Sequence, residues 1–440
     1  MTKKSIAHDI LVIASPIIVQ NLVQYIQLQV DMAMLGRYNL HFLSAIGNVL
    51  FPYTIMYAFL AAISTGATVL IAHTIGAGAL KSARRYSEVS FFYNALIAIP
   101  MFAILYFFAV AIMRGMGTSP DIVQYGSIYM RVLAFSFLSF SIELSVVAIL
   151  IGMGKTKAIM QAAIIRTIVN IALDWTLIYG NLGFPEAGIK GAALATTISN
   201  FSAAFYLVIY YLADKKLSIK PTLYGIFKPK WSIEINSIKI GLPYGLEAML
   251  WSFGQLILIR LINIIDPYAA GSYVLIARIQ AITFFFYVGL ARGTLTLVGQ
   301  SMGAGKRKEA IHTGMVSLYM SLIICVIAAV LFTTIPDKIL SIFTTEHDLI
   351  SRLQPLMFII AINVFPVSVN VVIGNAIRGM KDTLWMFYTQ SFGTLFVIGM
   401  SSLMLFVFQY KLTGIFITIL TDEIVRSVLN FWRFYKTPVS

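Results

Sequence analysis

Leu70-Ile-Ala-His-Thr-Ile-Gly-Ala-Gly78 ends one apolar segment of this chain, and Leu297-Val-Gly-Gln-Ser-Met-Gly-Ala-Gly305 ends a later one. Basic residues and an alanine follow both stretches. A second pair of motifs, Gly152-Met-Gly-Lys-Thr-Lys157 and Arg378-Gly-Met-Lys-Asp-Thr383, is separated by nearly the same distance along the chain. Two pairs at nearly one offset indicate an internal duplication, in which the Gly-Ala-Gly segments form tight turns at the ends of spans.

The composition is that of a membrane protein. Of the 440 residues, 59% are hydrophobic and 11% are charged, and the mean hydropathy is +0.85. Soluble domains carry about 25% charged residues. The composition therefore excludes a soluble enzyme, a disordered chain and an outer-membrane barrel, whose strands alternate polar and apolar residues. The single cysteine, Cys325, excludes a disulfide framework and a cysteine metal cluster.

The apolar residues are gathered into segments of the length that crosses a bilayer, about 20 residues. Twelve such segments cover 10–35, 44–75, 87–113, 122–153, 157–180, 189–213, 238–265, 268–302, 310–334, 349–378, 384–409 and 412–434. The sequence thus predicts an all-α polytopic membrane protein. Its N-lobe is 1–213 with helices one to six, its cytoplasmic linker 214–237, and its C-lobe 238–440 with helices seven to twelve. Six spans in each half give both halves the same sidedness, so the repeat is parallel.

The net charge of +14 follows the topology. With the N-terminus inside, the inner segments hold 20 lysines and arginines, six of them lysines between Lys215 and Lys239, and the outer segments hold 5. Cytoplasmic loops are enriched in basic residues. We therefore expect both termini in the cytoplasm and no nucleic-acid partner.

Polar residues form a stripe on the first span. Gln20, Gln24, Gln27 and Asp31 step by four, three and four residues and so share one face of a helix. An unpaired polar group facing lipid is costly. This face therefore lines a cavity or packs against polar partners.

The fifth span has a similar face, formed by Arg166, Asn170 and Asp174. Counted from the glycines at the outer helix ends, Asp31 and Asp174 both lie roughly 8–9 Å deep. Ionisable residues at membrane depth indicate functional sites. Two acids at one depth predict a cation site, and the alternative is a polar cluster that only joins helices.

The chain resembles the multidrug and toxic compound extrusion (MATE) transporters, and among them the DinF-like branch. The resemblance runs from the first span to the eleventh and is specific in its order and spacing. It rests on Val30-Asp-Met-Ala-Met-Leu-Gly36, the Gly-Ala-Gly turn after the second span, Asn170-Ile-Ala-Leu-Asp174, Gly191-Ala-Ala-Leu-Ala-Thr196, Gly241-Leu-Pro243, Val298-Gly-Gln-Ser-Met-Gly303 and Arg378-Gly-Met-Lys-Asp-Thr383.

The resemblance implies two six-helix bundles around a V-shaped cleft and export of a substrate against inward flow of H⁺ or Na⁺. The acidic site of the branch falls on Asp31, Asn170, Asp174 and Thr196, which would also hold a Na⁺ ion. A proline tied to bending of the first helix matches Pro16. We expect a monomer in the cell (inner) membrane, in contact with lipids, with no cofactor besides the coupling ion. An apolar, Met-rich cleft suits small amphipathic cations as substrates.

The C-lobe departs from the NorM-like branch of that family. The two positions at which that branch keeps a carboxylate hold Trp251 and Val367 here. A different acid, Glu247, lies at nearly the same depth as Arg278, which predicts a buried Glu247–Arg278 pair. Glu143 on the fourth span has two candidate partners, Arg131 and Arg166.

Two other functions compete with efflux. A lipid-linked precursor flippase of the same superfamily usually has fourteen spans and a strongly cationic cavity. An intramembrane prenyltransferase needs paired Asp-rich loops, and no such pair occurs at a span end. The sequence therefore favours a transporter that is not an enzyme.

Overall fold

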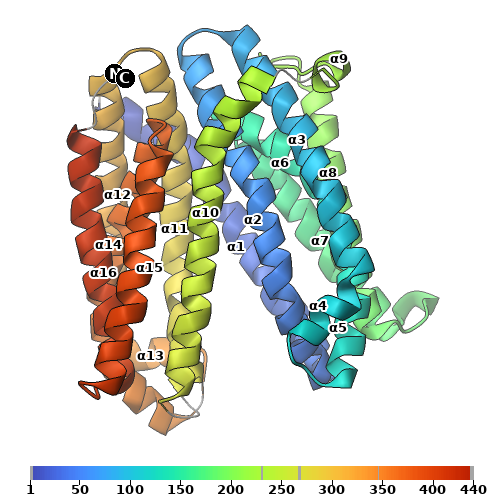
Figure 1. The fold of residues 1–440 in the computed structure, drawn as a ribbon, viewed down its shortest axis with the longest axis vertical. Coiled ribbons are helices and arrows are strands. Elements are labelled where there is room, and N and C mark those ends of the chain that lie inside the picture. The colour runs from blue at the N-terminus through green and yellow to red at the C-terminus, as the bar shows by residue number, and fades with distance from the viewer. Residues whose placement is uncertain (1–2, 229–230, 266–268, 345, 437–440) are drawn as a thin grey trace. The chain divides into compact units, whose positions relative to one another are not determined.

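A computed structural model describes residues 3–228, 231–265, 269–344 and 346–436 (Figure 1). Positions 229–230 of the predicted linker lie outside the described residues. Within the described residues the chain is helical and has no strand, which confirms the all-α prediction. The helices are α1 (Lys3–Tyr38), α2 (Leu40–Gly76), α3 (Leu80–Phe107), α4 (Ala109–Gly115), α5 (Pro120–Ala134), α6 (Ser136–Gly152), α7 (Lys157–Tyr179), the 3₁₀ turn η1 (Asn181–Gly183), α8 (Gly188–Ala213), α9 (Leu223–Ile226), α10 (Trp231–Asn263), α11 (Ala269–Gly303), α12 (Arg307–Thr334), α13 (Pro336–Ser341), α14 (His347–Gly379), α15 (Thr383–Phe406) and α16 (Lys411–Lys436).

Every predicted span corresponds to one of these helices or to a consecutive pair. Ten helices of the described chain are long and apolar enough to cross a membrane. α5 and α6 together make an eleventh span, bent by 42°. α16 is the twelfth, and it is less apolar because Asp422, Glu423 and Arg426 lie near its middle. The fold is that of a multi-pass, twelve-helix membrane protein.

The duplication is visible in the helix ends. α2 ends at Gly76 and α11 at Gly303, while α4 begins at Ala109 and α13 at Pro336, and both pairs have the offset that separates Leu70 from Leu297. The counterpart of the α5–α6 pair is the single helix α14. Shifted by this offset, the beginning of α5 and the end of α6 fall on the beginning and end of α14. The two halves therefore repeat in structure as well as in sequence.

The repeated motifs form the tight turns that the sequence predicts. Gly78 and Gly305 both adopt a positive φ, 71° and 73°, which glycine tolerates without a steric cost. The later pair differs, because Gly154 (φ 74°) has Lys381 (φ 69°) as its counterpart. A lysine is strained at a positive φ, so the turn at Lys381 costs more conformational energy than the turn at Gly154.

The chain forms two compact units, one made of residues up to Ile18 together with Pro243–Ser440, and the other of Val19–Leu242. The predicted division differs, because it assigned all of residues 1–213 to the N-lobe and began the C-lobe at residue 238. Both boundaries of the structure fall inside a helix, one in α1 near Pro16 and one in α10 at Pro243. Hydropathy locates each span, but it does not show against which bundle each half of a helix packs.

Close backbone approaches hold the first halves of α1 and α10 in place. In the unit that contains the C-terminal helices, a Cβ atom at Gly289 of α11 would lie 3.1 Å from the backbone oxygen of Ala14. In the other unit, a Cβ atom at Gly241 of α10 would lie 2.4 Å from the backbone oxygen of Ala62 in α2. Gly289 follows Ala62, and Gly241 follows Ala14, at the offset of the internal repeat. The two contacts are repeat counterparts. In each repeat, the first part of the first helix therefore packs with the helices of the other repeat.

Candidate cation site

The second half of α1 packs along α7 in the unit Val19–Leu242. Thr167 of α7 donates a hydrogen bond to Gln27 Oε1 at 3.1 Å, and the Tyr179 hydroxyl donates to the Met34 carbonyl at 2.8 Å. These two bonds bracket Asp31. The polar face of the first span therefore meets the polar face of the fifth.

Between these bonds, Asp31 and Asp174 lie with their carboxyl groups within hydrogen-bonding reach of each other. Asp174 is 1% exposed. Among the described residues, neither of its oxygens has a hydrogen-bond partner with a proton to give, and Asp31 Oδ1 has none either. An ionised carboxylate only accepts, so a bond between the two groups requires a proton. Like charges so close repel strongly away from water, and a proton or another cation between them removes that repulsion.

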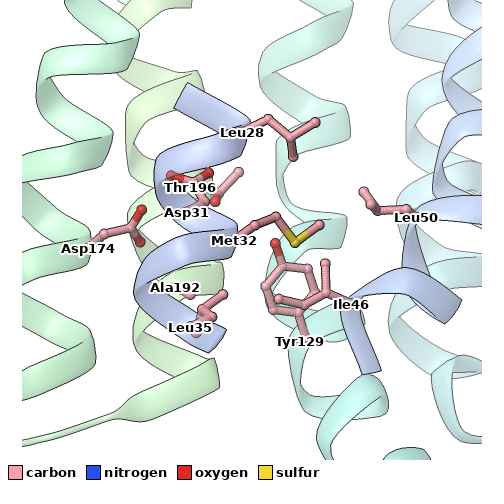
Figure 2. A pocket seen from close by; sticks show the side chains of 10 residues that line it. All are labelled: Leu28, Asp31, Met32, Leu35, Ile46, Leu50, Tyr129, Asp174, Ala192 and Thr196. Atoms are coloured by element: carbon pink, nitrogen blue, oxygen red, sulfur yellow. The ribbon is translucent and has the colours of Figure 1, made fainter. Parts of the chain in front are cut away.

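A small cavity opens beside this pair, and Figure 2 shows the side chains around it. Its volume is about 30 Å³. This is room for about one water molecule or a small cation, and too little for an amphipathic compound. The lining residues, from α1, α2, α5, α7 and α8, are Leu28, Asp31, Met32, Leu35, Ile46, Leu50, Tyr129, Asp174, Ala192 and Thr196.

Two hydroxyl groups complete the polar part of the cavity. Thr196 of α8, which the family resemblance singled out, lines it together with both acids. Tyr129 of α5 also lines it, with its hydroxyl within hydrogen-bonding reach of Thr196. Sequence reasoning missed Tyr129, because no polar periodicity marks it among the 22 tyrosines of the chain.

Asn170 lies on the face of α7 that also carries Asp174, and it is fully buried. It is not among the residues that line the cavity. Neither polar atom of its side chain has a partner in the described part of the chain. Its role as a cation ligand stays a prediction.

The three glutamines of the α1 stripe differ in environment. Gln27 is buried and bonded to α7, so it joins helices and is not part of the cavity lining. Gln20 and Gln24 are half-buried. Their contact with a cavity stays a prediction.

Glu143 of α6 forms a buried ion pair with Arg166 of α7. Of the two candidate partners this is the one found, and Arg131 is exposed. Because the pair is internally neutral, Arg166 does not compensate the charges of Asp31 and Asp174.

The predicted Glu247–Arg278 pair is wrong. Glu247 of α10 is bonded to Arg378 of α14 at 2.5 Å, and the Arg378 guanidinium lies over the Tyr244 ring, 5.4 Å from its centre. Arg278 is exposed. A count along the helices fixes depth only, whereas a partner is also chosen by the direction in which each side chain leaves its helix.

The described residues contain no group of three histidines, cysteines or acids that could hold a metal ion. A Na⁺ ion at this site would therefore take two carboxylates and fill its coordination with neutral oxygens. Thr196 and Tyr129 offer such oxygens at the cavity. The donor set is hard and oxygen-only, which suits a proton or Na⁺ and not a transition metal.

A family model described as MatE matches the chain twice, over residues 16–176 and 243–403. The starts of the two matches are separated by the offset of the internal repeat. The chain belongs to the MatE family. Its duplication is thus the duplication of the family domain, and the parallel repeat predicted from the sequence is confirmed.

Relatives of this MatE protein cover nearly its whole length. The probable multidrug resistance protein NorM of Thermotoga maritima is 27% identical over 98% of this chain and 92% of its own. The uncharacterised transporter YisQ of Bacillus subtilis is 28% identical over 92% of this chain and 89% of its own. A solved outward-facing structure of a multidrug resistance MATE family transporter has the same fold, with a TM-score of 0.91 and 19% identity over 98% of this chain and 95% of its own.

Proposed function

We propose that this protein is a secondary active multidrug efflux transporter, which exports amphipathic, cationic compounds by antiport with H⁺ or Na⁺ and alternating access. The observation that carries the proposal is the Asp31–Asp174 pair, buried at membrane depth with no basic partner in the described residues. Relatives that match most of the chain are named multidrug resistance proteins, which supports efflux.

The pair and its cavity serve the coupling ion in this proposal. The cavity is too small for an amphipathic substrate, so substrate and ion occupy different places. A ligand shifts a conformational equilibrium only by its different affinity for the two states. The ion and the substrate must therefore each favour a different conformation of the protein.

α1 supplies a connection through which the ion acts. Its first half packs with the C-terminal helices and its second half carries Asp31. Asp31 lies 15 residues beyond Pro16, roughly 22 Å along the helix. Proline frees a backbone carbonyl one turn earlier and permits a kink. Ion binding at Asp31 would change the bend of α1 at Pro16.

The chain would lie in the cell (inner) membrane with both termini in the cytoplasm. The excess of basic residues in the inner segments, 20 against 5, supports this orientation. The acids Asp31 and Asp174 in the unit Val19–Leu242, together with the absence of an acid at Trp251 and Val367, favour the DinF-like branch.

Transport into sealed vesicles tests the proposal. The protein is reconstituted in liposomes, and uptake of a fluorescent amphipathic cation is followed after a pH gradient or a Na⁺ gradient is imposed. We expect accumulation that needs one of the two gradients and that an uncoupler of that gradient abolishes. Equal uptake with and without gradients, or movement of a fluorescent lipid instead, would contradict antiport.

A further inference from the structure

A second buried acidic cluster lies near the middle of α16, in the unit formed by the C-terminal helices. Asp422 is 3% exposed, and its neighbours Glu423 and Arg426 are largely buried. The Asp31–Asp174 site belongs to the other unit, so this cluster is separate from it.

Arg426 is shared between two acids. Its Nη2 lies 2.8 Å from Asp422 Oδ2 and 2.6 Å from Glu423 Oε1, and its Nε donates to Asp422 Oδ2 at 2.9 Å. Asn370 donates to the other Glu423 oxygen at 2.6 Å. Glu423 therefore has both oxygens satisfied. Two carboxylates with one guanidinium leave one negative charge of the cluster uncompensated.

The unsatisfied atom is Asp422 Oδ1. It is buried, and it has no hydrogen-bond partner among the residues that the structure describes. It faces Gly393 of α15, where a Cβ atom would lie 2.6 Å from it and 2.6 Å from Arg426 Nε. Glycine at this position leaves the room that the carboxyl group needs. A buried charged oxygen without a partner is costly, and a proton on this oxygen lowers that cost by removing the charge.

Other ionisable groups on the neighbouring helices are already paired. Glu247 of α10, which acts electrostatically on Arg426, is bonded to Arg378 of α14. Asp382, just before α15, is bonded to Arg433 of α16 at 2.7 Å. In the described residues, neither pair contributes a net positive charge to the cluster. Its excess charge is thus compensated at Asp422 itself.

The internal repeat provides a second, independent argument that this cluster is a binding site. The helices α10, α14, α15 and α16 are the repeat counterparts of α1, the α5–α6 pair, α7 and α8. The first site takes Asp31, Tyr129, Asp174 and Thr196 from α1, α5, α7 and α8. The second cluster takes Asn370, Gln390 and the Asp422–Arg426 segment from the counterparts of the last three, with Gln390 accepting from Arg426 at 3.1 Å. Glu247, on the counterpart of α1, acts on Arg426 only electrostatically. Both halves thus place a buried acidic cluster among counterpart helices of the repeat.

We propose that Asp422 is a second proton-binding site, in the C-terminal bundle, which gains and loses one proton at Oδ1. Oδ2 keeps its bonds to Arg426 in both states, so protonation changes the charge of the cluster without breaking its contacts. The protein would then carry two proton sites, one in each half. This inference concerns proton binding and does not depend on the direction or substrate of transport.

Infrared difference spectroscopy on the full-length protein tests the proposal, with acidification as the trigger and the C=O stretch of protonated carboxyl groups as the signal. The background is the double variant Asp31→Asn/Asp174→Asn, which silences the first site. We expect one slowly exchanging carboxyl band to remain in this background. It should disappear in Asp422→Asn and persist in the control Asp121→Asn, which removes an exposed acid outside the cluster. In Glu423→Gln it should need a lower pH to appear, because that change removes the excess negative charge of the cluster.

Isotope labelling gives a second measurement that needs no change in the cluster. The remaining band should shift when aspartate carries a ¹³C carboxyl group and stay in place when glutamate does. Absence of any buried band in the double variant, or a shift with labelled glutamate, would overturn the proposal. Loss of the band on adding Na⁺ at constant pH would also overturn it, because the site would then bind a metal ion.

Discussion

The carboxyl groups of Asp31 and Asp174 meet across the contact between α1 and α7, and in the described chain no N–H or O–H group donates a hydrogen bond to either oxygen of Asp174. Two such groups cannot both stay ionised so close together without a cost. The same burial that makes the ionised pair costly favours a proton or another small cation between the two groups. The two carboxyl groups thus repel each other when the site is empty and are held together when a proton or cation lies between them.

Neutralising either acid should abolish gradient-driven efflux. In Asp31→Asn and Asp174→Asn, uptake in vesicles should fall to the level of empty liposomes, because the site can no longer exchange a cation. At alkaline pH the melting temperature should stay equal to wild type or rise, since each change removes a like-charge repulsion. Asp121→Asn, an exposed acid of the same unit, is the control and should transport normally. Wild-type efflux in both variants would exclude this pair as the coupling site.

The sequence predicted the Asp31–Asp174 pair for a physical reason, whereas Thr196 was expected only from the resemblance to the MATE transporters. Helical periodicity places residues on a face, and a count from the helix ends gives their depth, so Asp31 and Asp174 were found without coordinates. Tyr129 was not, because a lone phenol on an apolar helix leaves no pattern. Arg378 was missed as the partner of Glu247 because depth does not report side-chain direction. The exchange of the first half of α1 was missed because hydropathy does not report packing.

The ion pair of Glu247 and Arg378 should show strong coupling in a double-mutant cycle. Each of Glu247→Gln and Arg378→Gln leaves one buried charge unpaired, which costs about 3–5 kcal/mol. The double variant should be closer to wild type than the sum of the two losses. Thermal unfolding in detergent measures the cycle. Arg278→Gln is the matched control and should change stability by about 0.5 kcal/mol at most, because this side chain is exposed. Additive losses would mean that the two residues do not interact.

A side chain at position 241 should destabilise the protein, because Gly241 contacts the backbone of Ala62. In Gly241→Ala the new Cβ atom would meet a backbone oxygen at 2.4 Å, so a helix must move. We expect a loss of about 1–3 kcal/mol, the usual cost of overpacking. Gly47→Ala, with no atom within 4 Å of the new Cβ, is the control and should be neutral or stabilising, because alanine favours a helix. Equal stability of the two variants, measured by thermal unfolding, would argue against the close approach.

Bending of α1 at Pro16 should couple the cation to the substrate. Pro16 is buried inside α1 and lacks a backbone N–H, so one carbonyl a turn earlier has no helical partner and the helix can kink there. Ionised, Asp31 needs partners such as Thr196. Protonated, it releases them, and the second half of α1 can lean away from α8, whereas a bound Na⁺ ion would hold Asp31 and Thr196 together. Spin-label distances between these two segments, measured at pH 5 and pH 8 with and without Na⁺, should differ between conditions.

Pro16→Ala separates this mechanism from a simple binding role of Asp31. Alanine restores the missing hydrogen bond and straightens the helix, so α1 loses one of its two shapes. Substrate binding should persist while gradient-driven exchange slows, because the ion still binds but no longer moves the helix. The distances in this variant should become independent of pH and Na⁺. Identical distances in all four conditions for the wild-type protein would refute the bending mechanism, even if Asp31 proved essential for transport.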